Sequence, residues 1–265
     1  MSDSSLLAHA VEGEGEPLLV LNGGMMTWAA WGPVTEALAA DYRLVLCDLR
    51  GQLLSPGAAP ADLAGNVADL TALLDHLEIE SAHVLGTSYG GEIGLLLAAF
   101  APERVRSLVA VTVADYATDA IRRGAEDLRR LIASGREGGD KGALHDRVIR
   151  EVYSSDYRDR FAAELAARRE EVAGLPDSWF EGLETILTAT ERFDVRPYLG
   201  KIGCPTLVVI AARDDVMPQQ RSIDLAAAID RAEIKVHQTS GHALVAEDPA
   251  WLTAACSDFL RRHAA

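Results

Sequence analysis

At 265 residues, the chain is long enough to form one large core with a modest insertion. The formal net charge of −15 argues against a nucleic-acid partner and against binding to an anionic membrane surface, since both favour clustered Lys and Arg. The three cysteines are widely spaced and form no CxxC pair, so neither a zinc site nor a disulfide framework is indicated. No apolar run could span a bilayer, and the first residues lack the basic start of a signal peptide, so we expect a cytoplasmic protein.

Apolar runs predict a series of strands that alternate with helices. Strands are expected at residues 6–11, 18–21, 42–47, 82–85, 106–113, 206–211 and 234–236. Helices are expected at residues 31–40, 61–77, 93–101, 221–228 and 249–263. This alternation predicts βαβ units, and hence an α/β fold with a doubly wound, mostly parallel sheet.

The alternation stops between residues 115 and 197, where no strand is evident. Helices are expected there at residues 119–133, 144–153 and 157–172, followed by a segment at 178–190 that holds Trp179 and Phe180. We interpret residues 115–197 as a helical lid (cap) inserted into a core made of residues 1–114 and 198–265. The apolar side chains of its last segment, among them Trp179, are interpreted either as the lid's own core or as part of a substrate pocket.

The most informative stretch lies where the strand at 82–85 gives way to a helix. Its spacing, Gly86-x-Ser88-x-Gly90, is that of a nucleophile elbow. Glycines allow strand and helix to approach each other, and the N-terminus of the helix favours negative charge beside the serine. The alternative interpretation is a glycine-rich turn that contains an incidental serine.

A serine nucleophile needs a base, and the base needs an orienting carboxylate. In a doubly wound sheet these groups lie beyond the carboxyl ends of strands, which leaves Asp214, Asp215 and His242 as candidates. Each acid could instead be a helix cap or a solvated loop charge. No pair of histidines has metal-ligand spacing, so we expect neither a metal nor a cofactor.

With these residues in view, the sequence resembles the α/β-hydrolase superfamily, in the lidded group of esterases, enol-lactonases and carbon–carbon bond hydrolases. The motifs that carry the resemblance are GTSYGG at 86–91, DLRG at 48–51, Asp214 four residues before Pro218, and SGH at 240–242 followed by Glu247 and Pro249. They span most of the chain apart from the expected lid. Jointly they are specific, although each motif alone is weak.

The resemblance implies a role for each site residue. Ser88 is the expected nucleophile, His242 the general base and Asp214 the orienting acid, with Asp215 as the runner-up. Asp115 is a third candidate for the acid, because some members of the superfamily carry theirs after the strand that precedes the lid. The oxyanion hole is expected to use the backbone amides of Tyr89 and Gly24, with Met25 as the alternative to Gly24.

Two positions depart from the family pattern. Asn22 precedes Gly23 and Gly24 where relatives usually have a histidine before a glycine, and enol-lactonases of this group also carry an Asn there. Gln52 and Leu53 stand where relatives usually show His-Gly, so we expect a loop of altered shape near the mouth of the site. The segment before residue 18 is also short, so we expect the first strand of the usual sheet to be absent.

These features predict a serine hydrolase that acts on a small-molecule substrate through an acyl-enzyme. Met25, Met26 and Trp28, together with Trp179 from the lid, indicate a rather apolar pocket, so we expect a small or medium ester or lactone. Met25 and Trp179 are the residues expected to contact the substrate. Two other readings stay open: a cofactor-free lyase or oxygenase in which His242 moves protons, and a small-molecule receptor without turnover.

Overall fold

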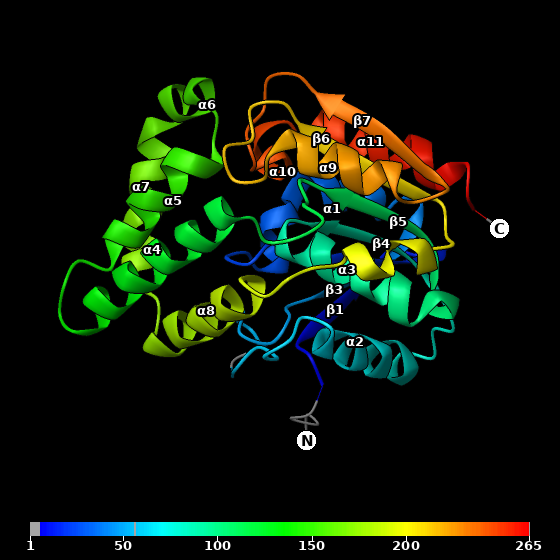
Figure 1. The fold of residues 1–265 in the computed structure, drawn as a ribbon, viewed down its shortest axis with the longest axis horizontal. Helices are drawn as coiled ribbons and strands as arrows, with labels where there is room; N and C mark the ends of the chain where they lie inside the picture. The colour runs from blue at the N-terminus through cyan, green and yellow to red at the C-terminus, as the bar shows by residue number, and fades with distance from the viewer. Residues whose placement is uncertain (1–5, 56, 265) are drawn as a thin grey trace.

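The structure, a computed structural model, describes residues 6–55 and 57–264. Within those residues the centre of the molecule is a seven-stranded sheet in the order β1-β3-β2-β4-β5-β6-β7 (Figure 1). Its strands are β1 (His9–Glu12), β2 (Glu16–Leu21), β3 (Tyr42–Cys47), β4 (Ala82–Thr87), β5 (Val105–Val111), β6 (Thr206–Ala211) and β7 (Ala232–His237). β1 runs antiparallel to β3, and the remaining neighbouring strands are parallel. The predicted doubly wound, mostly parallel sheet is confirmed.

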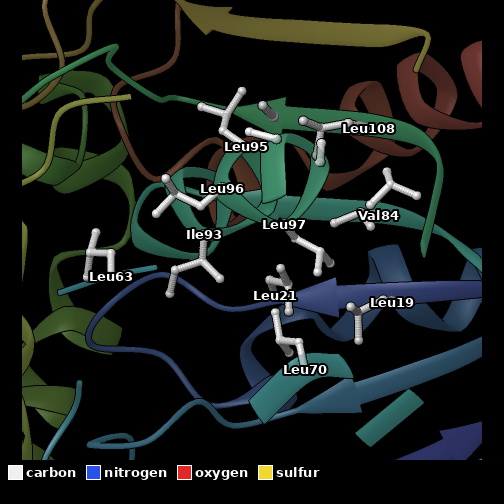
Figure 2. Packing of buried hydrophobic residues seen from close by; sticks show 14 of the residues in the cluster. Leu19, Leu21, Leu63, Leu70, Val84, Ile93, Leu95, Leu96, Leu97 and Leu108 are labelled. Carbon is white, nitrogen blue, oxygen red and sulfur yellow. The ribbon is translucent and has the colours of Figure 1, made fainter. Parts of the chain in front are cut away.

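The central strands are apolar on both faces because helices cover both sides of the sheet. In β2, Leu18 and Val20 belong to one buried cluster, whereas Leu19 and Leu21 belong to the other. This division follows from the strand geometry, in which successive side chains point to opposite faces. Figure 2 shows part of the cluster that contains Leu19 and Leu21, which lie near Val84 of the neighbouring strand.

Two helices cover the face that contains Leu18, and three cover the face that contains Leu19. The first pair is α1 (Gly32–Leu38) and α11 (Pro249–Arg261), which pack against each other. The second group is α2 (Gly65–His76), α3 (Tyr89–Phe100) and α9 (Gln219–Ala227). The short helix α10 (Leu244–Glu247) and three 3-10 helices, Trp28–Trp31, Pro102–Arg104 and Arg196–Lys201, complete the described core. None of the helices in the described ranges is long and apolar enough to cross a membrane.

Between β5 and β6 the described chain forms five helices that lie together beside the sheet (Figure 1). They are α4 (Asp119–Arg136), α5 (Gly142–Val152), α6 (Ser155–Arg160), α7 (Ala162–Ala173) and α8 (Asp177–Thr190), and we call them the helical segment. The single helix expected at 157–172 was wrong, because the backbone at Phe161 leaves the helical conformation (φ −113°, ψ 29°) and separates α6 from α7. The boundaries at residues 115 and 197 stay a prediction.

The helical segment has its own small apolar core, and that core also touches the sheet domain. Trp179, Phe180 and Leu183 of α8 are buried together with Ile132 and Leu144 of α4 and α5. Met25 and Leu53, from loops that follow strands, pack against this cluster. α8 is further held by a hydrogen bond of 2.8 Å from the Ala59 amide to the Thr185 hydroxyl. The segment therefore lies over the loops at the carboxyl ends of the strands.

Candidate active site

Ser88 occupies a strained turn between β4 and α3. Its backbone has φ 50° and ψ −123°, a conformation that residues with a side chain rarely adopt. The turn is tight: a Cβ on Gly86 would lie 2.5 Å from the Gly90 carbonyl oxygen, and one on Gly90 would lie 2.5 Å from the Leu21 carbonyl carbon. Both positions therefore require glycine. The strain at Ser88 matches the elbow geometry that the sequence pattern predicts.

Asp214 and His242 meet beyond the ends of β6 and β7. The Nδ1 atom of His242 lies 2.8 Å from Oδ2 of Asp214, whose side chain is almost fully buried. The other carboxylate oxygen of Asp214, Oδ1, accepts hydrogen bonds of 2.8 Å from the amides of Val216 and Met217. These contacts fix the carboxylate, which in turn orients the imidazole ring.

Neither of the other two candidate acids supplies the hydrogen bond to His242. Asp215 lines the same cavity as His242, but the hydrogen bond to the imidazole comes from Asp214. Asp115 instead faces Arg221, at 3.6 Å between Oδ2 and Nη1. Burial raises the pKa of Asp115, and the charge of Arg221 opposes that shift. The structure therefore brings Asp214, rather than Asp215 or Asp115, to the histidine.

The loop that carries His242 is tied to the helical segment. Oε1 of Glu247 accepts hydrogen bonds from the amides of Gly241, at 3.1 Å, and Ser154, at 2.8 Å. Oε2 of the same carboxylate accepts a hydrogen bond of 2.6 Å from the Ser154 hydroxyl. This explains why a glutamate follows the SGH motif: its carboxylate stabilises the histidine loop and joins it to the chain between α5 and α6.

A cavity of about 770 Å³ lies between the sheet domain and the helical segment, and it brings the candidate residues together. Ser88 and His242 both line it, as do Gly24 and Tyr89, the residues expected to supply the oxyanion hole. Met25 and Trp179, expected to contact substrate, line it as well. A further part of its wall comes from apolar residues of α8, namely Leu183, Ile186 and Leu187. Within the described residues the Ser88 and His242 side chains share no hydrogen bond, and in unliganded sites such bonds are often long.

A buried polar network holds the loop that contains Gly24. Nδ2 of Asn22 donates to the Cys47 carbonyl and to Oδ1 of Asp48, both at 2.9 Å, and Oδ1 of Asn22 accepts from Nε1 of Trp31 at 3.0 Å. Gln52 completes the network, since its Nε2 donates to the Gly23 carbonyl at 2.7 Å.

The two departures from the family pattern therefore lie side by side. Nδ2 of Asn22 and Oε1 of Gln52 are 3.4 Å apart, and that oxygen also accepts a hydrogen bond of 2.7 Å from the Leu49 amide. Burial raises the pKa of Asp48, while hydrogen bonds from the amides of Leu54 and Trp28 oppose that shift. The network fixes the backbone directly before Gly24.

Comparison with known proteins shows which family the chain belongs to. The sequence pattern of the family described as "alpha/beta hydrolase fold" matches residues 16–249. The chain belongs to this family of hydrolases. Of its relatives, a protein from Azorhizobium caulinodans with the provisional name carbamate hydrolase RutD is 35% identical, over 92% of this chain and 90% of the relative. The 2-hydroxymuconate semialdehyde hydrolase of Pseudomonas sp. strain CF600 is 31% identical, over 94% of this chain and 88% of that protein.

A solved structure supports the same fold. The enol-lactonase from Burkholderia xenovorans LB400 has a TM-score of 0.84 and 25% identity, over 96% of this alpha/beta hydrolase and 96% of that chain. Membership of the α/β-hydrolase superfamily, which the motifs predicted, is confirmed.

Sequence reasoning missed two residues of this alpha/beta hydrolase site. Gln52 was recognised only as a departure, although it holds the Gly23 carbonyl. Glu92 was not singled out, yet it lines the cavity, is 1% exposed, and burial raises its pKa to about 8. Its position four residues after Ser88 was the available signal, because residues i and i+4 share one face of a helix.

Proposed function

We propose that the protein is a serine hydrolase that cleaves a small or medium, largely apolar carboxylic ester or lactone through an acyl-enzyme. The observation that carries this proposal is the 2.8 Å contact between His242 and Asp214 at a cavity that Ser88 also lines. The strained backbone at Ser88 supports it, since strain of this kind is concentrated at functional sites.

In this mechanism the Ser88 hydroxyl attacks the substrate carbonyl, and Nε2 of His242 accepts its proton. The Asp214 carboxylate keeps the Nδ1 proton of His242 and stabilises the imidazolium that forms. The developing oxyanion receives hydrogen bonds from the backbone amides of Gly24 and Tyr89. His242 returns its proton to the leaving group, then activates a water molecule that cleaves the acyl-enzyme.

The helical segment has a role in the same proposal, as a lid spanning residues 115–197. Trp179 and Met25, which both line the cavity, contact the apolar part of the substrate. Covering the site in this way limits the access of water and strengthens the electrostatic interactions inside it. The cavity volume of about 770 Å³ suits a small molecule rather than a folded protein substrate. A cytoplasmic location and the absence of a nucleic-acid partner stay predictions.

The test is hydrolysis of 4-nitrophenyl esters and of lactones with graded chain lengths. Ser88→Ala is expected to lower kcat by about 10⁶-fold, as loss of the nucleophile does in a well-studied protease. A carbamate ester belongs in the same panel, because one relative bears the name of a carbamate hydrolase. Retention of near wild-type turnover by Ser88→Ala would contradict the assignment.

A serine-directed fluorophosphonate separates this function from the two alternatives. Labelling of the wild type that is lost in Ser88→Ala and kept in Ser155→Ala, a substitution on the surface of α6, supports the acyl-enzyme. An unlabelled protein that still transforms a substrate would favour proton chemistry by His242. A ligand that raises the Tm and is never consumed would favour a receptor.

A further inference from the structure

Glu92 lies one helical turn beyond Ser88, at the wall of the cavity. Its amide donates a hydrogen bond of 2.9 Å to the Ser88 carbonyl, which fixes the two residues on the same face of α3. Its side chain is 1% exposed and nevertheless lines the cavity. The carboxyl group is therefore withdrawn from bulk solvent but lies beside the space that a substrate would occupy.

The carboxyl of Glu92 lacks the partners that a buried acid ordinarily has. Its Oε2 atom is buried and has no hydrogen-bond partner among the described residues. Most buried polar side chains in proteins have a hydrogen-bond partner, so each exception calls for an explanation. The acyl-transfer steps proposed above give Glu92 no task.

We propose that Glu92 is a substrate-recognition residue whose neutral carboxyl group donates a hydrogen bond to an oxygen acceptor in the acyl part of the substrate. This inference rests on the proposed function and refines it. The preferred substrate is then an ester or lactone with an ether, keto or similar oxygen in an otherwise apolar acyl chain. Such an oxygen gives the buried carboxyl the partner that the described part of the chain does not provide.

The neutral form of the carboxyl follows from its surroundings. Burial is the sole cause that raises the pKa of Glu92 to about 8, and no cation opposes the shift. The titratable core residues on the same cavity are Tyr89, Asp215 and His242. The chain between β5 and β6 adds His145, Tyr153, and arginines and acids from α4, α5 and α7. None of these groups moves the pKa of Glu92. Below that pKa the carboxyl is an O–H donor, whereas above it the group can only accept hydrogen bonds.

The experiment compares two 4-nitrophenyl esters of equal chain length, the pentanoate and the 3-methoxypropanoate, which has an ether oxygen in place of one methylene. The measured quantity is the ratio of their kcat/KM values in the wild type, Glu92→Gln and Glu92→Leu. Intrinsic reactivity of the esters cancels when this ratio is compared between variants. Gln keeps an N–H donor of the same shape, and Leu removes every hydrogen bond.

One hydrogen bond to a neutral partner corresponds to about threefold to tenfold in the ratio. We expect the wild type and Glu92→Gln to favour the ether ester by this factor relative to Glu92→Leu. The preference of the wild type should decline as the pH rises through the pKa of Glu92, because the donor is lost, while that of Glu92→Gln should not change with pH.

Two results would overturn the inference. One is an equal ratio in the wild type and in Glu92→Leu, and the other is a wild-type preference that does not decline with rising pH. Ser88→Ala, measured with the same two esters, separates this failure from failure of the proposed function. If Ser88→Ala abolishes hydrolysis while Glu92 leaves the ratio unchanged, the serine mechanism stands and only the recognition role is lost.

Discussion

Replacing Asp214 by Asn tests the proposed triad with almost no change of shape. In the native structure Oδ1 of Asp214 accepts two backbone N–H groups, from Val216 and Met217, and Oδ2 faces Nδ1 of His242. The Asn oxygen must take the place of Oδ1, because an NH₂ group there would face two donors. Its NH₂ group then faces His242 and donates to Nδ1. That contact places the imidazole proton on Nε2, so the ring cannot accept a proton from Ser88.

The magnitude follows from the hydrogen bonds that hold the Asn in this orientation. Reversing the amide would leave two buried backbone donors unsatisfied, at about 1–3 kcal/mol each, or roughly 2–6 kcal/mol in total. At about 1.4 kcal/mol per factor of ten, the productive state of His242 becomes about 30-fold to 10⁴-fold less populated. The corresponding change in a serine protease lowers kcat by about 10⁴-fold, at the upper end of this range. We therefore expect a loss of about 10³-fold or more.

The assay is kcat for the ester that the wild type hydrolyses fastest, with a thermal melt to show that the variant is folded. Asp215→Asn is the matched control, because it removes the same charge at the adjacent residue and leaves the contact between Asp214 and His242 intact. Its kcat should stay within about tenfold of the wild-type value, a factor of ten being about 1.4 kcal/mol. If Asp214→Asn keeps wild-type turnover, or if Asp215→Asn loses more, the orienting role of Asp214 is wrong.

Two further substitutions test the framework of the site. Gln52→Leu leaves the buried Leu49 amide without its described partner and removes one of the two hydrogen bonds to the Gly23 carbonyl, the other coming from the Met26 amide, so we expect urea unfolding to show a loss of about 1–3 kcal/mol, with kcat also reduced; unchanged stability would contradict the network. Gly90→Ala forces a Cβ against the backbone of the β2 end and should lower the free energy of unfolding by about 1–3 kcal/mol or more. In contrast, Gly124→Ala within α4 meets no atom within 4 Å and should stabilise the protein by about 0.5–1 kcal/mol, so equal effects of the two would refute the steric argument.

The sequence predicts the sheet well because its central strands are buried on both faces. β3 and β6 have the expected bounds, and each contains an uninterrupted apolar stretch, residues 44–47 and 207–211. β1 and β7 are edge strands, less buried and less regular in pattern, and their bounds differ from those expected. The break at Phe161 was missed because the helical periodicity continues across it.

A residue of the candidate site can be predicted from the sequence where its place in the fold determines its role. It is harder to predict where contacts between residues distant in the sequence determine that role. Ser88, Asp214 and His242 each follow the end of a strand, so topology alone brings them to one edge of the sheet. Gln52 and Asn22 are 30 residues apart, and nothing in their spacing indicates that their side chains touch. Glu92 stands in the first turn of an apolar helix. The sequence pattern there shows only a single charged residue before a buried run, and it does not indicate that the side chain is buried beside the cavity.

The contact between Asn22 and Gln52 changes how the two departures from the family pattern are understood. A single changed side chain in a buried network leaves a hydrogen-bond donor or acceptor unsatisfied. Two carboxamide side chains each offer a donor and an acceptor, and here Nδ2 of Asn22 lies 3.4 Å from Oε1 of Gln52. Carboxamides also do not titrate, so the Gly23 carbonyl that Gln52 holds keeps its place at any pH at which the protein is folded. Histidines at these positions would change charge near neutral pH. The contact between the two carboxamides is thus independent of pH, which leaves Asp48, whose pKa burial raises, as the titratable member of this network, and Glu92 as a second buried acid at the cavity.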